Sequence, residues 1–249
     1  MSNSKKKKSN FTKHIQNLNR AEFETEREEK KALHFINEGN IEAASRIYRE
    51  LIKRKTKSHK VYANLAVINR KRDKSQSIEL LREAVKIKPD YYLGYYNLGN
   101  ILLEEERLDE SINFFNKAIN INPKHLESLI NLGNAYLLKD RDSDAINYFQ
   151  KVLEINPNYV DAYINIGNVY KEQGCLNEAI SSYKKVIEIN PDRVDAYVNI
   201  SLTELLKGNY IDGWKNYELR SHSKRPILPH LMPRIQKCSH LKKTKNKKL

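Results

Sequence analysis

Four prolines recur at a fixed interval along this chain, and that interval constrains the fold more than any other feature. Pro89, Pro123, Pro157 and Pro191 follow one another at a spacing of 34 residues. A period of this length is typical of a helix-turn-helix unit that cannot bury its own apolar face and must stack on its neighbours. Each proline is also expected to end a helix, because the residue before it is pushed out of the helical region.

Apolar and small residues repeat together with the prolines. In the unit that begins at residue 92, Tyr95, Leu98 and Leu102 follow helical spacing and predict a first helix over residues 92–105. A second apolar stripe predicts a second helix over residues 109–121. A glycine stands inside the first helix of three units, and we expect it to make room where the two helices cross closely. These glycines are Gly99, Gly133 and Gly167.

The pattern resembles the tetratricopeptide repeat, and it is most similar to the repeat region of O-linked N-acetylglucosamine transferases. The resemblance implies an all-α fold, a right-handed superhelical solenoid of about six helix-turn-helix units over residues 25–220, and no catalytic domain is expected. In the last unit the second helix should act as a cap, with Trp214 and Tyr217 closing the apolar end of the stack. The expected units are 25–58, 59–91, 92–125, 126–159, 160–193 and 194–220.

The net charge of +14 lies in the two ends of the chain. Residues 1–20 hold six Lys/Arg and no acid, and residues 221–249 hold nine Lys/Arg and no acid. We therefore expect basic, disordered tails over residues 1–24 and 221–249. The alternative is that these tails bind nucleic acid or an anionic membrane surface through salt-sensitive contacts. The first two repeats are also locally basic.

Other sequence features argue against several classes of protein. No apolar run approaches the ~20 residues of a membrane helix, and the first residues lack the apolar stretch of a signal peptide. Two cysteines make no disulfide framework, so a cytoplasmic location is expected. No Gly-rich phosphate loop occurs, and we expect no enzymatic activity, catalytic residue, cofactor, metal or small-molecule substrate. The metal-capable side chains near the end match no zinc pattern; they are His222, His230, Cys238 and His240.

Asparagines at two repeat positions carry the functional prediction. The sixth position of five units and the ninth position of three units are asparagine. These positions are three residues apart and share one helix face, which we expect to line the concave groove. An asparagine amide offers both donors and an acceptor, which suits it to holding the backbone of an extended peptide. The sixth-position column is Asn64, Asn97, Asn131, Asn165 and Asn199, and the ninth-position set is Asn100, Asn134 and Asn168.

The resemblance implies a role for the sixth-position column. In the similar repeat region of O-linked N-acetylglucosamine transferases, an asparagine ladder at this position holds a peptide. Two alternatives stay open: duplication has merely copied these asparagines, or they form hydrogen bonds between repeats. Because asparagine costs a few tenths of a kcal/mol relative to alanine inside a helix, its retention indicates some purpose.

Charged positions on the same face indicate which peptides are favoured. The carboxylate clamp with which some tetratricopeptide repeats hold acidic peptides is absent, because its basic positions carry Tyr96, Asp161 and Asn165. Acids recur at the second position of three units, as Glu127, Asp161 and Asp195. A neutral or basic peptide is therefore expected rather than an acidic one.

The predicted function is a non-catalytic protein–protein interaction scaffold that binds an extended segment of a partner in the Asn-lined groove. An alternative is an accessory or remnant subunit of a protein O-glycosyltransferase system. It is suggested by the Gly-Trp-x-x-Tyr-Glu-x-Arg string over residues 213–220, which resembles the last repeat of bacterial proteins in which a glycosyltransferase domain follows. Any sugar transfer would then need a separately encoded catalytic partner.

Overall fold

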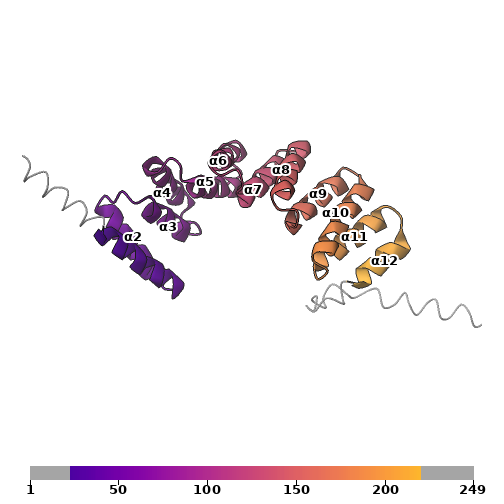
Figure 1. Ribbon diagram of the computed structural model, residues 1–249, viewed down its shortest axis with the longest axis horizontal. Coiled ribbons are helices and arrows are strands. Elements are labelled where there is room, and N and C mark those ends of the chain that lie inside the picture. Colours follow the sequence, from indigo (N-terminus) through magenta and orange to yellow (C-terminus); the bar gives the residue numbers. More distant parts are fainter. Residues whose placement is uncertain (1–22, 220–249) are drawn as a thin grey trace, which may run out of the picture. The chain divides into compact units, whose positions relative to one another are not determined.

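The computed structural model describes residues 23–219, in which helices alternate with short turns and no strand occurs (Figure 1). The chain divides into two compact bodies, Met1–Ile155 and Asn156–Leu249. Their described parts, residues 23–155 and 156–219, are here called the N-terminal body and the C-terminal body. None of the described helices has the length and hydropathy of a membrane-spanning helix. The predictions for both basic tails fall on residues 1–22 and 220–249, outside this range.

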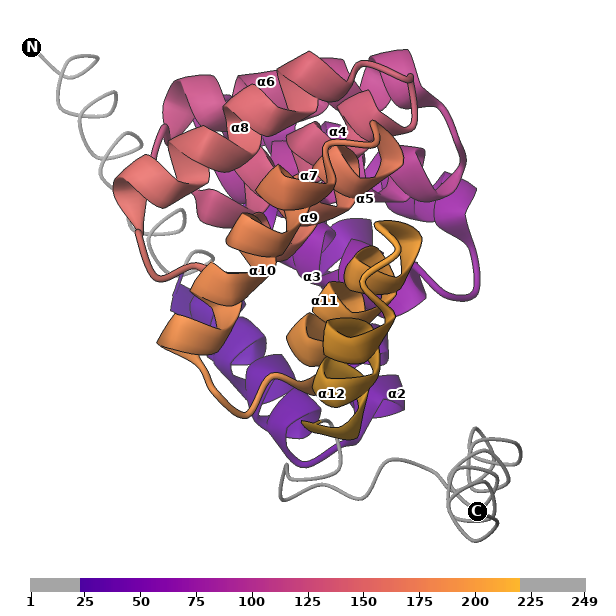
Figure 2. The same cartoon turned by 90° about the vertical axis from the view of Figure 1, so that its right-hand side faces the viewer.

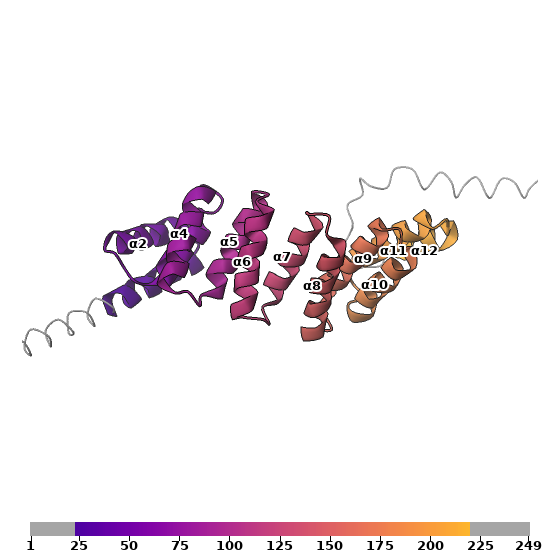
Figure 3. The ribbon, with the colours of Figure 1, turned by 90° about the horizontal axis from the view of Figure 1, so that it is seen from above.

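The N-terminal body is a series of paired helices, the first of which covers residues 23–37. Within it α3 packs on α4, α5 on α6 and α7 on α8, while α4 contacts α5 and α6 contacts α7 (Figure 3). Every pair is therefore packed against a neighbouring pair. The helices are α2 (Ile41–Lys53), α3 (His59–Asn69), α4 (Lys74–Ile87), α5 (Tyr92–Glu104), α6 (Leu108–Ile121), α7 (Leu126–Leu137) and α8 (Asp142–Ile155).

The C-terminal body repeats the same arrangement with two pairs. Here α9 packs on α10, α11 packs on α12, and α10 contacts α11 (Figure 2). The four helices of the C-terminal body are α9 (Val160–Glu172), α10 (Leu176–Ile189), α11 (Val194–Leu206) and α12 (Tyr210–Leu219).

The sequence predicted the extent of two helices of the N-terminal body closely. The helices predicted over residues 92–105 and 109–121 agree with α5 and α6 to within one residue at each end.

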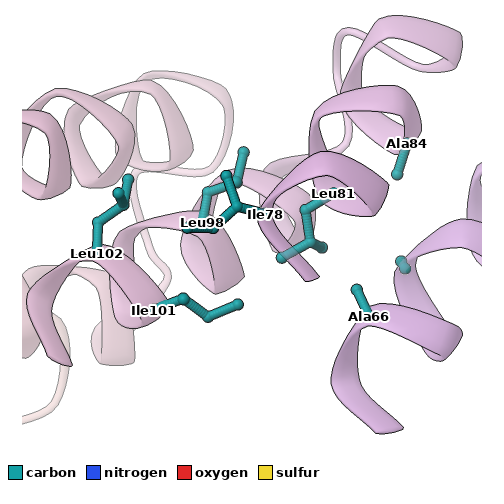
Figure 4. Close-up of a cluster of buried hydrophobic side chains, with 8 residues drawn as sticks. Ala66, Ile78, Leu81, Ala84, Leu98, Ile101 and Leu102 are labelled. Atoms are coloured by element: carbon teal, nitrogen blue, oxygen red, sulfur yellow. The ribbon is translucent and has the colours of Figure 1, made fainter. Parts of the chain in front are cut away.

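The core is made between repeats as well as within them. One buried cluster of the N-terminal body draws side chains from three successive helices, α3, α4 and α5, and so crosses from one repeat into the next (Figure 4). Burial of apolar surface stabilises such an interface by roughly 25 cal/mol per Å². The cluster includes Ala66, Ile78, Leu81, Ala84, Leu98, Ile101 and Leu102.

The helical glycines lie where the two helices of a pair cross closely, as predicted. A β-carbon on Gly99 would come within 2.6 Å of the ring of Phe115, which is fully buried. Glycine is therefore needed because the neighbouring ring occupies the space of a side chain. The equivalent contacts join Gly133 to Phe149 and Gly167 to Tyr183.

A serine hydroxyl also links the crossing helices in some pairs. In α6, Ser111 Oγ donates a hydrogen bond of 2.9 Å to the carbonyl oxygen of Gly99 in α5. In the last pair the two residue types have changed places, because Ser201 of α11 donates to the carbonyl oxygen of Gly213 in α12, at 2.7 Å. The same serine-to-glycine hydrogen bond thus joins both pairs, but its donor is on the second helix in one pair and on the first helix in the other.

The last helix, α12, has exposed apolar side chains. Trp214 contacts Tyr217 edge to face, with ring centroids 5.7 Å apart. Nevertheless Trp214 is 43% exposed and Ile211 is 86% exposed. The closure of the stack by Trp214 and Tyr217 stays a prediction, because residues 220–249 lie outside the described range.

Charged pairs join neighbouring repeats of the N-terminal body. Glu104 of α5 accepts from Arg70 and lies 3.2 Å from the Nζ atom of Lys74. Farther along, Lys139 pairs with Asp109. These contacts add a polar component to the apolar stacking between adjacent repeats.

Candidate functional site

The sixth-position column places one asparagine on each of the first helices α3, α5, α7, α9 and α11. All five side chains are half-buried. The residues beside them in sequence, such as Leu98 and Gly99 next to Asn97, are buried against the second helix. The column therefore lies at the edge of the packed interface, with part of each side chain accessible to another molecule.

Asn64 is tied to the preceding repeat. Its Nδ2 atom donates a hydrogen bond of 3.1 Å to the hydroxyl of Tyr48 in α2. Tyr48 is fully buried, and burial raises the pKa of its hydroxyl, although the bond to Asn64 acts in the opposite direction. Asn64 thus satisfies a buried hydroxyl across the repeat boundary.

Asn131 forms a second contact between repeats. Its Nδ2 atom, on α7, donates to Oδ1 of Asn100 on α5 at 2.7 Å. Asn100 is only 8% exposed, so its amide oxygen is satisfied within the protein. The structure therefore brings a sixth-position and a ninth-position asparagine together, and hydrogen bonding between repeats explains this pair without a ligand.

Asn168, the ninth-position asparagine of the C-terminal body, also forms a hydrogen bond within the chain. The hydroxyl of Tyr183 donates to Oδ1 of Asn168 at 2.7 Å. Burial, with a smaller contribution from Glu172, raises the pKa of Tyr183 to about 12, so the hydroxyl keeps its proton and remains a donor. Asn134 and Asn165 also have interaction partners within the chain.

Two members of the sixth-position column differ from the others. The side-chain amides of Asn97 on α5 and Asn199 on α11 form no hydrogen bond with any residue that the structure describes. Only the backbone carbonyl of Asn199 is used, as the acceptor for Thr203 Oγ1 at 2.7 Å. Both amides therefore keep their full donor and acceptor capacity for another molecule.

The second-position acids are already paired. Arg193 bridges Asp161 at 3.1 Å and Asp195 at 2.7 Å. The hydrogen bond from Arg193 is the main reason why the pKa of Asp195 is lowered. Glu127 lies 3.2 Å from Nε2 of His125. Arg193 therefore offsets part of the negative charge of Asp161 and Asp195, whereas burial lowers the pKa of His125, so its contact leaves the charge of Glu127 in place.

Reasoning from the sequence missed the hydrogen bonds that join asparagines to the buried Tyr48 and Tyr183. Both tyrosines occupy the repeat position of Phe115 and Phe149 on the second helix. The available signal was the hydroxyl itself, because a fully buried tyrosine needs a partner that phenylalanine does not.

No metal-binding group of three or more His, Cys, Asp or Glu side chains is found between residues 23 and 219. The four metal-capable residues His222, His230, Cys238 and His240 lie outside that range. The expectation for them therefore stays a prediction.

Known proteins share both the sequence pattern and the fold. Residues 92–158 and residues 160–193 each match the model of the tetratricopeptide repeat. No curated protein matches the chain.

Several solved structures are similar to this chain. MamA is 24% identical, with a TM-score of 0.61 over 69% of this chain and 98% of that one. YrrB is 21% identical, with a TM-score of 0.57 over 79% of this chain and 97% of its own. Pseudomonas aeruginosa pilF is 17% identical, with a TM-score of 0.69 over 90% and 99% of the two chains. Residues 92–158 and 160–193 are therefore tetratricopeptide repeats by sequence, and the described part of the chain shares the all-α fold of these structures.

Proposed function

We propose that this chain is a non-catalytic scaffold that binds an extended peptide segment of a partner protein along the first helices of its repeats. The presence of tetratricopeptide repeats supports a protein or peptide partner. YrrB, with which the chain shares its fold, is described as a tetratricopeptide repeat protein with an unusual peptide-binding site.

The observation that carries the proposal is the unused amide of Asn97. It lies on α5, between Asn64 on α3 and Asn131 on α7 along the series of first helices in the N-terminal body. Asn64 and Asn131 each donate one N–H to a neighbour and keep an acceptor oxygen. An extended peptide backbone presents donors and acceptors in turn, so three such amides can hold it irrespective of its sequence.

The C-terminal body carries its own stretch of the column, with Asn165 on α9 and Asn199 on α11. Asn199 there corresponds to Asn97, because its amide is also unused among the described residues. We assign to each body one free amide for the backbone of a partner. The pairing of Asp161 and Asp195 with Arg193 favours a neutral segment over a strongly basic one.

The proposal is tested by substituting the unused and the used asparagines separately. Peptides are first selected on the full chain from a random library of unstructured peptides, and their affinity is then measured for each variant. Replacing both Asn97 and Asn199 by alanine should weaken binding by about tenfold, which corresponds to about 1.4 kcal/mol. Unfolding in urea should show unchanged or slightly higher stability, because alanine is the better helix former.

Asn131→Ala provides a comparison for stability, at an amide that already bonds within the chain. This change removes the bond to buried Asn100 and should lower the free energy of unfolding by about 1 kcal/mol. Equal peptide affinity for the wild type and for the Asn97→Ala/Asn199→Ala variant would rule out the proposed role of the free amides.

A further inference from the structure

The second and third helices of the N-terminal body enclose a pocket of about 490 Å³ that contains none of the asparagines discussed above. One wall is α2, which contributes Arg46 and Arg49. The other wall comes from the end of α3 and the turn after it, with Lys71 and Arg72. Ile41 and Ile68 supply an apolar part of the lining.

The charge of this pocket is unbalanced. Five cationic side chains and two carboxylates line it, an excess of three positive charges. One carboxylate, Glu50, is already held by Lys53 at 2.7 Å. The four remaining cations, Arg46, Arg49, Lys71 and Arg72, have no ion pair with any described residue, whereas nearby Arg70 and Lys74 both contact Glu104.

We propose that this basic pocket binds an acidic segment of a partner protein, with an apolar side chain in the pocket and carboxylates at its rim. Arginine presents several donors in a plane that matches a carboxylate, so Arg46 and Arg49 are suited to the rim. Ile41 is 42% exposed, and an apolar side chain that covers it removes this surface from water. The proposal does not depend on the asparagine column, for which we propose a neutral segment.

The occupant is expected to come from another molecule. Residues 1–20 and 221–249 contain no acid at all, so neither segment complements the pocket. A peptide also fits better than a nucleic acid. The pocket has an apolar lining and the carboxylates of Glu42 and Glu50, whereas a phosphate backbone is held by continuous positive charge.

The test uses the full chain and a fluorescent twelve-residue peptide of alternating glutamate and leucine. A peptide with glutamine in place of glutamate and a peptide with alanine in place of leucine separate the contributions of charge and apolar contact. The pocket variant carries Arg46→Gln, Arg49→Gln, Lys71→Gln and Arg72→Gln. A charge-matched control carries Lys30→Gln, Lys31→Gln, Lys124→Gln and Lys184→Gln, all at exposed positions outside the pocket.

We expect the pocket variant to bind the acidic peptide at least about tenfold more weakly, a loss of about 1.4 kcal/mol, and the control to bind like the wild type. Both altered peptides should bind more weakly to the wild type, and circular dichroism should show the same helicity for all variants. Equal loss in the control, or equal binding of the glutamine peptide, would overturn the proposal. Tighter binding of a twelve-nucleotide oligothymidylate, or full competition by inorganic phosphate, would assign the pocket to phosphate groups instead.

Discussion

The repeat formed by α5 and α6 and the last repeat, formed by α11 and α12, solve the same packing problem in opposite ways. In the former the glycine is on the first helix and the serine on the second, and a fully buried ring fills the crossing. In the last repeat the serine is on the first helix and the glycine on the second. Tyr217, at the position of Phe115, is only half-buried. The glycine and the serine of such a crossing can thus lie on either helix, whereas the α7/α8 and α9/α10 pairs carry Ala145 and Ala179 at the serine position and have no hydroxyl there.

Their neighbours explain the difference in burial. The α5/α6 pair contacts α4 on one side and α7 on the other, whereas the described contacts of the α11/α12 pair are with α10. A ring at a crossing that has a repeat on each side has less room to adjust than a ring in the last pair. The last pair can tolerate a more exposed ring and a larger side chain at its crossing.

The largest difference in stability between the two repeats should follow removal of the aromatic ring at the crossing. Phe115→Ala leaves a cavity in a closely packed site and is expected to lower the free energy of unfolding by about 3–5 kcal/mol. Tyr217→Ala, at the equivalent position, should cost less than half as much because Tyr217 already contacts solvent. Urea unfolding of both variants measures this, and equal losses would show that the two crossings are equally rigid.

A smaller difference should appear when a methyl group is added at the crossing. Gly99→Ala places a β-carbon against the stiff ring of Phe115 and should cost about 1–2 kcal/mol, even after the gain in helix propensity. Gly213→Ala meets the Cγ and Cδ2 atoms of Leu205 at 2.7 Å and the backbone oxygen of Ser201 at 3.2 Å, and because the leucine side chain can move more easily than a ring, the loss of stability should be smaller than for Gly99→Ala.

The control for this comparison is Gly99→Ala combined with Phe115→Leu. If the ring is the obstacle, the double variant should lose less stability than the sum of the two single changes. Strict additivity would contradict the steric explanation.

The smallest expected difference is in how the stability of the two regions depends on pH. Arg193 lowers the pKa of Asp195 in the folded chain, so this carboxylate stabilises the fold above its unfolded pKa of about 3.9 and the effect is lost as the pH falls through the lower folded value. The stability difference between the wild type and Arg193→Gln should therefore shrink between about pH 5 and pH 3, from at most about 1 kcal/mol. Tyr91 holds the equivalent position before α5, and Tyr91→Gln should show no such dependence over that range. Thermal unfolding at several pH values tests both variants.

Much of this fold follows from the sequence because its determinants are local and periodic. The spacing of Tyr95, Leu98 and Leu102 fixed the extent of α5, and the proline period fixed where α6 ends. The need for Gly99 was also predictable, since an interior glycine is unfavourable unless something occupies its side-chain space. Periodicity is informative here because each repeat contacts only its neighbours.

Whether each asparagine side chain has a hydrogen-bond partner could not be predicted from the same pattern. Asn97 and Asn131 occupy equivalent positions, yet only Asn131 has a hydrogen-bond partner, because the partner is a side chain of the preceding repeat. The ninth residue of that repeat is Asn100, whereas the residue at the ninth position before Asn97 is Val67. Valine cannot accept a hydrogen bond, so the amide of Asn97 stays available.

The ion pair of Arg70 with Glu104 has a consequence for how such an array can change. The two residues are 34 positions apart, so loss of the repeat over residues 92–125 would keep the apolar faces in register but set Arg70 opposite Leu138. Apolar stacking permits many orders of the repeats, whereas each charged contact suits one neighbour. The ion pairs between repeats therefore depend on the order of the repeats. An array with the repeats in another order should still fold, but charged residues at the new contacts between repeats would lack their partners.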